Sequence, residues 1–167
     1  MENTQLPKPS CKALAAIIEK EIVPDLGRKL LEFGSCGTTI ADLISAHCDY
    51  LALTDKAPDI TEKLSRFAEE SKIQLIPASE LSEDCYFGRF HLVYTLFGFR
   101  GLPHLVDEIM GLRRLILKGG KIVIIDHPSD HFADECTKQL RRCGFQSIRT
   151  ETSEAEGKEI FLISAEK

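Results

Sequence analysis

The sequence lacks any apolar run long enough to cross a membrane. Its longest apolar stretches, such as Ile122–Ile125, are far shorter than the ~20 residues that a bilayer requires. The N-terminal segment MENTQLPKPS also lacks the basic-then-apolar pattern of a secretory signal peptide. We therefore expect a cytoplasmic protein that has no membrane partner.

Cysteine pairs at the spacing of zinc or redox sites are missing as well. The six cysteines are scattered, and none pairs at the two-residue spacing of zinc ribbons or thioredoxin-like sites. In a cytoplasmic chain this distribution favours reduced, partly buried thiols. Cys36 is a candidate for reactivity because it lies near a predicted helix N-terminus that would lower its pKa, although packing is the favoured interpretation.

An excess of positive charge is absent too. The net charge of −5 does not favour binding to a phosphate backbone, so we expect no nucleic-acid partner. The chain has 167 residues, of which 43% are hydrophobic and 28% charged, which suits one substantial core. We expect a single domain over residues 1–167, with a loosely held arm over 1–9 and an N-terminal helical segment over 10–26.

Apolar spacing along the chain alternates between strand and helix patterns. Strands are predicted over 29–33, 50–54, 73–76, 90–97 and 121–125. Helices are predicted over 10–22, 39–47, 59–71, 102–117 and 131–142, with Gly144 closing the last of them.

Two further strands are predicted near the C-terminus, over 145–152 and 159–165. They are joined by too little chain for a helical crossover, so they should form an antiparallel hairpin. The whole pattern predicts an α/β protein: a three-layer sandwich around a mostly parallel seven-stranded sheet that ends in this hairpin.

The segment RKLLEFGSCGTT indicates a buried strand that enters a glycine-containing turn and then a helix. Gly34 and Gly37 remove side chains where a ligand could approach the backbone. Thr39 fits the start of a helix whose free amides would face such a ligand. Asp55 lies roughly 20 residues beyond Glu32, about the separation at which a second-strand carboxylate binds a ribose. A nucleoside-containing ligand fits both features.

These segments together resemble class I S-adenosylmethionine-dependent methyltransferases, from about Ser10 to the C-terminus. The matching segments, in order, are LLEFGSCGTT, LALTD, IPASE, FHLVYTLFGFRGLPHL and LRRLILKGGKIVIIDH. The terminal hairpin also matches the family. The resemblance implies a Rossmann-like fold, an S-adenosylmethionine cofactor and transfer of its methyl group to an unidentified acceptor.

The resemblance also implies roles for particular residues. The methionine part of the cofactor would be bordered by Glu32, Gly34 and Cys36, the ribose bound by Asp55, the adenine bordered by Ala78, Ser79 and Glu80, and the methyl group flanked by Thr95 and Leu96. Glu32 has a second, compatible interpretation as a carboxylate that accepts hydrogen bonds from loop amides.

Methyl transfer needs little beyond alignment of the reactants, but two histidines are candidates where a base is required. His104 and His127 each lie near the carboxyl end of a predicted strand or in the loop beyond it. A surface or helix-start position is the competing interpretation of both. Asp126 would line the pocket or cap the next helix, and Tyr94 is expected in the core.

The chain departs from the family pattern in its glycine turn. The usual acid-x-Gly-x-Gly-x-Gly becomes Glu32-Phe-Gly-Ser-Cys-Gly-Thr38, so two glycines are missing or displaced. The acidic metal ligands of catechol-type enzymes are absent, and we expect no metal. The alternative function is therefore a non-catalytic protein of the same fold that binds or scaffolds a partner. A nicotinamide-dependent oxidoreductase would need a Gly-x-Gly-x-x-Gly turn, which the sequence lacks.

The short N-terminal segment leaves little material for a lid over an acceptor. We therefore expect either a bulky acceptor or a second subunit, such as another copy of the chain, that completes the pocket.

Overall fold

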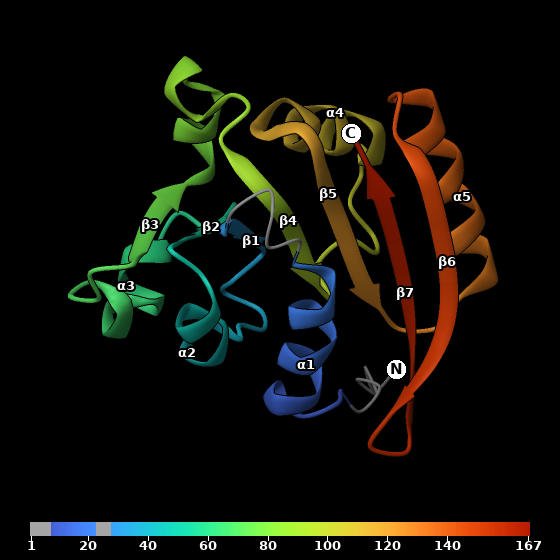
Figure 1. The fold of residues 1–167 in the computed structure, drawn as a ribbon, viewed down its shortest axis with the longest axis horizontal. Coiled ribbons are helices and arrows are strands. Elements are labelled where there is room, and N and C mark those ends of the chain that lie inside the picture. Colours follow the sequence, from blue (N-terminus) through green and yellow to red (C-terminus); the bar gives the residue numbers. More distant parts are fainter. Residues whose placement is uncertain (1–7, 23–27) are drawn as a thin grey trace.

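The computed structural model describes residues 8–22 and 28–167, which include a seven-stranded sheet in the order β3-β2-β1-β4-β5-β7-β6 (Figure 1). The strands are β1 Lys29–Phe33, β2 Tyr50–Asp55, β3 Ile73–Pro77, β4 Phe90–Leu96, β5 Ile116–Asp126, β6 Gln146–Ala155 and β7 Lys158–Glu166. The pairs from β3 through β5 are all parallel, and β7 is antiparallel to both β5 and β6. The predicted mostly parallel sheet with a terminal hairpin is confirmed.

Helices cover both faces of the sheet and make three layers. They are α1 Cys11–Glu21, α2 Ala41–Ile44, α3 Ile60–Lys63, α4 Leu105–Leu115 and α5 Asp130–Arg142, with short 3-10 turns η2 Ser45–His47, η3 Ser65–Phe67, η4 Ala78–Ser82 and η5 Asp84–Tyr86. Apolar residues of α1, α2 and α3 share one core with one face of the sheet. Those of α4 and α5 pack on the opposite face. The three-layer sandwich is therefore also confirmed.

The N-terminal segment begins as predicted, because the Ser10 hydroxyl caps α1 by accepting a hydrogen bond from the Ala13 amide at 3.3 Å. The Ser10 amide and hydroxyl both donate to the Glu156 carboxylate, each at 2.7 Å. The start of α1 is thus tied to the turn between β6 and β7. The predicted arm up to residue 7 and the predicted helix end over 23–26 lie outside the described residues.

The predicted helix over 59–71 is wrong. The chain forms only the short α3 and then the 3-10 turn η3. Residues three apart share a face in a 3-10 turn, and here Leu64 and Phe67 are both buried in the core. Both side chains thus reach the core although the helix is short, and Asp59, whose side chain makes no capping hydrogen bond, forms an ion pair with Lys63 at 3.1 Å.

The boundary between the fourth predicted helix and the fifth predicted strand also differs from expectation. The helix stops at Leu115, and β5 already begins at Ile116, so Gly119 and Gly120 lie inside the strand. A side chain at Gly120 would lie 2.8 Å from the His91 carbonyl oxygen, while Gly119 has φ +81°. The two glycines therefore serve an irregular strand pairing rather than a helix end.

Two tight turns at the C-terminal end follow the sequence signals. Gly144, at φ +82°, closes α5: its amide donates to the Arg141 carbonyl at 3.0 Å, and the Phe145 amide donates to the Leu140 carbonyl at 3.1 Å. The turn between β6 and β7 is shorter than predicted, because Glu156 and Gly157 both have positive φ and form a two-residue hairpin turn.

Candidate functional site

The carboxyl ends of β1, β2 and β4 meet at one edge of the sheet, and the loops after them enclose a cleft of about 340 Å³. We call it the glycine cleft. It is lined by Phe33, Gly34, Cys36, Gly37, Asp55, Lys56, Ala57, Lys63, Gly98 and Leu102. Three of the predicted cofactor residues, at positions 34, 36 and 55, are thus brought together.

Two glycines allow the backbones to approach closely at the floor of this cleft. Gly34 has φ +87°, and a Cβ added there would lie 3.9 Å from the Gly98 Cα atom. The same Cβ would lie 3.8 Å from the Thr95 hydroxyl, and a Cβ at Gly98 would lie 3.2 Å from it. Thr95 is 1% exposed, and its hydroxyl has no hydrogen-bond partner among the described residues. An unpaired polar group therefore lies directly beside the two glycines.

Asp55 joins the loops on the other side of the cleft. Its carboxylate accepts a hydrogen bond from the Cys36 amide at 3.0 Å and another from the Ala57 amide at 2.8 Å. A carboxylate has about four acceptor sites, so the side chain, which is half-buried, keeps capacity for a ligand.

The favoured interpretation of Cys36 as a packing residue is confirmed, because its side chain packs against the core that α1 and α2 share, and the alternative of a lowered pKa is wrong. Burial and the nearby charge of Asp55 raise the pKa of the Cys36 thiol. The following helix, α2, has only four residues and begins at Ala41, so its dipole offers the thiol little support.

Glu32 does not line the cleft, because its side chain is fully buried under the turn. Its carboxylate accepts hydrogen bonds from the Ile40 amide at 3.1 Å and from the Tyr94 hydroxyl at 2.9 Å. Burial raises the pKa of Glu32, and these hydrogen bonds oppose the shift. The interpretation of Glu32 as an acceptor of loop amides is therefore confirmed, as is the placement of Tyr94 in the core.

The remaining predicted cofactor residues lie outside the cleft lining. Ala78, Ser79 and Glu80 belong to η4 just after β3, and Ser79 and Glu80 are exposed. Leu96 is buried and packs in the core that α1 and α2 share. Thr95 is buried beside the two glycines and does not itself line the cleft.

The two candidate bases are at different places. His127 is half-buried and its ring packs against Phe97, with ring centroids 4.6 Å apart. Burial lowers the pKa of His127. His104 is exposed and immediately precedes α4. Phe97 itself has φ +56°, an unusual conformation for an aromatic residue, and the Lys8 ammonium lies 5.1 Å from its ring centroid.

Asp126 holds a loop rather than a helix. Its buried carboxylate accepts hydrogen bonds from the Arg100 amide at 3.0 Å and the His127 amide at 2.8 Å. The cap of α5 is Ser129, whose hydroxyl accepts from the Phe132 amide at 3.4 Å. Burial raises the pKa of Asp126. The suggested capping role is therefore wrong, and Asp126 fixes the loop that follows β4.

Sequence reasoning missed several residues of the glycine cleft. Lys56 forms an ion pair with Glu108 of α4, which links the loop after β2 to that helix. Gly98 follows β4 as Gly34 follows β1, so the same argument about strand-end glycines could have found it. Lys56 carried no local signal, because its partner lies 52 positions away in the sequence.

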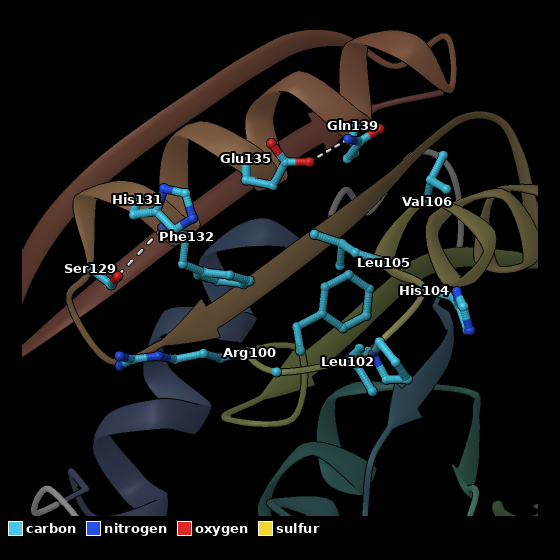
Figure 2. A pocket seen from close by; sticks show the side chains of 13 residues that line it. Arg100, Leu102, His104, Leu105, Val106, Ser129, His131, Phe132, Glu135 and Gln139 are labelled. Atoms are coloured by element: carbon cyan, nitrogen blue, oxygen red, sulfur yellow. Dashed lines mark hydrogen bonds between the residues drawn. The ribbon is translucent and has the colours of Figure 1, made fainter.

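A larger hollow of about 580 Å³ lies between the start of α4 and α5 (Figure 2). We call it the α4–α5 pocket. It is lined by Phe99, Arg100, Gly101, Leu102, Pro103, His104, Leu105, Val106, Ser129, His131, Phe132, Glu135 and Gln139. Leu102 also lines the glycine cleft, so the two cavities are neighbours.

Residues 8–22 and 28–167 contain no group of three or more His, Cys, Asp or Glu side chains that could hold a metal ion. The absence of a metal from the function stays a prediction. No helix within these residues has both the length and the apolar character needed to cross a membrane.

No protein-family model matches the chain, and no curated protein matches its sequence. Solved structures do match. An S-adenosylmethionine-dependent methyltransferase from Aquifex aeolicus aligns with a TM-score of 0.71 and 16% identity, over 95% of this chain and 93% of that one. The [4+2]-cyclase SpnF aligns with a TM-score of 0.74 and 12% identity, over 92% of this chain and 80% of that one.

A third structure contains a product of the cofactor. Phosphoethanolamine N-methyltransferase 2 from Haemonchus contortus, in complex with phosphomonomethylethanolamine and S-adenosylhomocysteine, aligns with a TM-score of 0.74 and 12% identity. The alignment covers 99% of this chain and 55% of that one. With the sheet order and terminal hairpin described above, these likenesses show that the chain has the fold of the class I S-adenosylmethionine-dependent methyltransferases.

Proposed function

We propose that the protein binds S-adenosylmethionine in the glycine cleft and transfers its methyl group to an acceptor. The observation that carries the proposal is the unpaired Thr95 hydroxyl beside Gly34 and Gly98. Leaving a buried hydroxyl unpaired costs about 1–3 kcal/mol, so such groups call for an explanation in a ligand or an ordered water. Ligands of open α/β sheets bind at this carboxyl edge.

The residues of the cleft suit the parts of the cofactor. Asp55 keeps acceptor sites for the ribose hydroxyls, while Gly34 and Gly37 leave the backbone open to the methionine part beside Cys36. Residues 78–80 border the adenine at the outer rim. S-adenosylmethionine supplies an already activated methyl group, so the task of the protein is to align the two reactants.

His127 is the better candidate for a base. Its lowered pKa keeps the imidazole neutral near pH 7, the form that can accept a proton. His104 is the other candidate for the base, because it lines the α4–α5 pocket. We place the protein in the cytoplasm, as a single domain whose acceptor side is open to a bulky acceptor or a second subunit.

The alternative is a non-catalytic protein of the same fold. It is favoured by Cys36 in place of a family glycine and by the Asp55 carboxylate, which already accepts two loop amides. The likeness to a cyclase also shows that this fold serves more than one reaction.

Calorimetry with S-adenosylmethionine and S-adenosylhomocysteine, on the wild type and a Gly37→Val variant, tests the proposal. A Cβ at Gly37 meets only the Gly34 carbonyl oxygen, at 3.6 Å, so valine enters the cleft without a clash or a positive φ. We expect binding to the wild type and loss of most affinity in the variant. Saturation at 100 times Kd should also stabilise the wild type by about 2.7 kcal/mol in a thermal shift.

Gly111→Val is the matched control, because Gly111 lies in α4 outside the cleft and a Cβ there meets no described atom within 4 Å. It should bind like the wild type. If neither ligand binds the wild type, the result favours the non-catalytic protein of the same fold. If the Gly37→Val variant binds as well as the wild type, the cofactor does not occupy this cleft.

A further inference from the structure

We infer that the α4–α5 pocket is the acceptor site and that it binds a molecule with an apolar body and a cationic amine at one end. That the pocket holds the methyl acceptor rests on the function proposed above. That the pocket binds an amine does not depend on it. The first support is position: the pocket is larger than the glycine cleft and shares the lining residue Leu102 with it. A molecule in the pocket that reaches Leu102 would therefore have one end near the proposed cofactor.

The wall formed by the start of α4 is apolar. Leu102, Leu105 and Val106 pack against the core but remain half-exposed, and they face the pocket. Phe132 of α5 lies across the pocket from this wall in Figure 2. These side chains form an apolar surface against which the apolar part of a ligand can pack.

The opposite end carries the one carboxylate among the described residues that line the pocket, that of Glu135. Gln139, which is 7% exposed, donates from its amide nitrogen to one Glu135 oxygen and accepts from Arg142 at 3.2 Å. Because Gln139 is buried and uses both ends of its amide, it holds Glu135 in place. Figure 2 shows Glu135 and Gln139 at the end of the pocket away from Leu102.

The Glu135 carboxylate keeps acceptor sites for a cation at this end, and the chain's own cations near it are Lys138 and Arg142, which donates to Gln139. Lys138 approaches the second Glu135 oxygen only at 4.0 Å, and its side chain is 68% exposed. Arg100 lies at the other end, near Ser129. An amine held by Glu135 would point its apolar body toward Leu102 and the glycine cleft.

The test is ligand-observed NMR at pH 7 with three probes of similar body: 2-phenylethylamine, 2-phenylethanol and 3-phenylpropionate. The Glu135 side chain is 42% exposed, so its charge-assisted hydrogen bond should favour the amine over the alcohol by only about two- to fivefold. The carboxylate should bind most weakly. Glu135→Gln should abolish the preference for the amine and leave binding of the alcohol unchanged.

Glu151→Gln, at an exposed carboxylate of β6 outside the pocket, is the control and should keep the wild-type order. Equal binding of amine and alcohol, stronger binding of 3-phenylpropionate, no binding of any probe, or a preference that survives Glu135→Gln would each overturn the inference. A preference for the amine without any binding of S-adenosylhomocysteine would overturn the proposed methyl transfer and leave the amine site standing.

Discussion

At the scale of single residues, the two carboxylates near the carboxyl ends of β1 and β2 have different tasks in the fold. Asp55 is half-buried and faces the glycine cleft, whereas Glu32 is fully buried beneath the turn. Both accept backbone amides of the same loop, from Cys36 and from Ile40. The loop after β1 is therefore held at two points by carboxyl oxygens, those of Asp55 and of Glu32. A substitution at each residue tests its contact separately.

Asp55→Ala should affect both stability and binding. A strand-tip carboxylate makes few core contacts, so its position in the strand alone would predict little change in stability. The structure shows two hydrogen bonds to loop amides, so the free energy of unfolding should fall by roughly 1–2 kcal/mol. Affinity for S-adenosylhomocysteine should fall about tenfold to a thousandfold, since two charge-assisted bonds to the ribose are lost.

Urea unfolding and calorimetry on the same Asp55→Ala preparation separate these effects. Lower stability with unchanged affinity would make Asp55 a structural tie alone and would remove it from the proposed cofactor site.

Glu32→Gln should reveal the raised pKa of the buried carboxyl. Because burial raises the pKa of Glu32 above its ordinary value of 4.5, the folded state holds a proton that the unfolded state releases as pH rises above that value. The contribution of Glu32 to stability is thus full below pH 4.5 and is lost as pH rises through the folded pKa. Glutamine resembles the protonated form and does not titrate.

The free energy of unfolding of the wild type minus that of Glu32→Gln should therefore fall as pH rises above 4.5, as measured by urea unfolding at several pH values. A difference that rises with pH would show instead that the hydrogen bonds from Ile40 and Tyr94 hold the charged form.

At the scale of elements, helix ends depend on one or two residues, and α5 ends as its sequence indicates. Gly144→Ala should lower the free energy of unfolding by about 1 kcal/mol, because φ +82° strains any residue with a Cβ. The new Cβ would also lie 3.4 Å from the Arg113 guanidinium. Thermal or urea unfolding measures the change.

Gly111→Ala is the matched control with the opposite expected sign. Gly111 lies in the interior of α4 with no described atom within 4 Å of a new Cβ, so alanine should stabilise the helix by roughly 0.5–1 kcal/mol. A stable Gly144→Ala variant would show that α5 ends without its left-handed turn.

At the scale of the whole molecule, the strand order creates both proposed sites. β1 and β4 are neighbours although β2 and β3 lie between them in sequence, because the chain reverses direction across the sheet at β1. The loops after these two strands therefore begin side by side, and Gly34 approaches Gly98 there. The loop after β4 continues past Leu102 into α4, which brings the α4–α5 pocket beside the glycine cleft.

The sequence by itself determined the features that depend on neighbouring residues. Apolar periodicity located the strands, Ser10 and Gly144 marked the ends of helices, and the short connection before Lys158 required a hairpin. The glycine turn after β1 and the acid at the tip of β2 also located the cleft. These signals are local because side-chain period, capping and turn conformation involve residues a few positions apart.

Only the tertiary structure decided which groups meet. Tyr94 reaches Glu32 from 62 positions away, and Lys56 reaches Glu108 from 52 positions away. The predicted helix after Asp59 shortens to α3 and η3, while Leu64 and Phe67 still reach the same core. Such partners follow from strand order and packing, which bring distant segments together, and no periodicity in the chain encodes them.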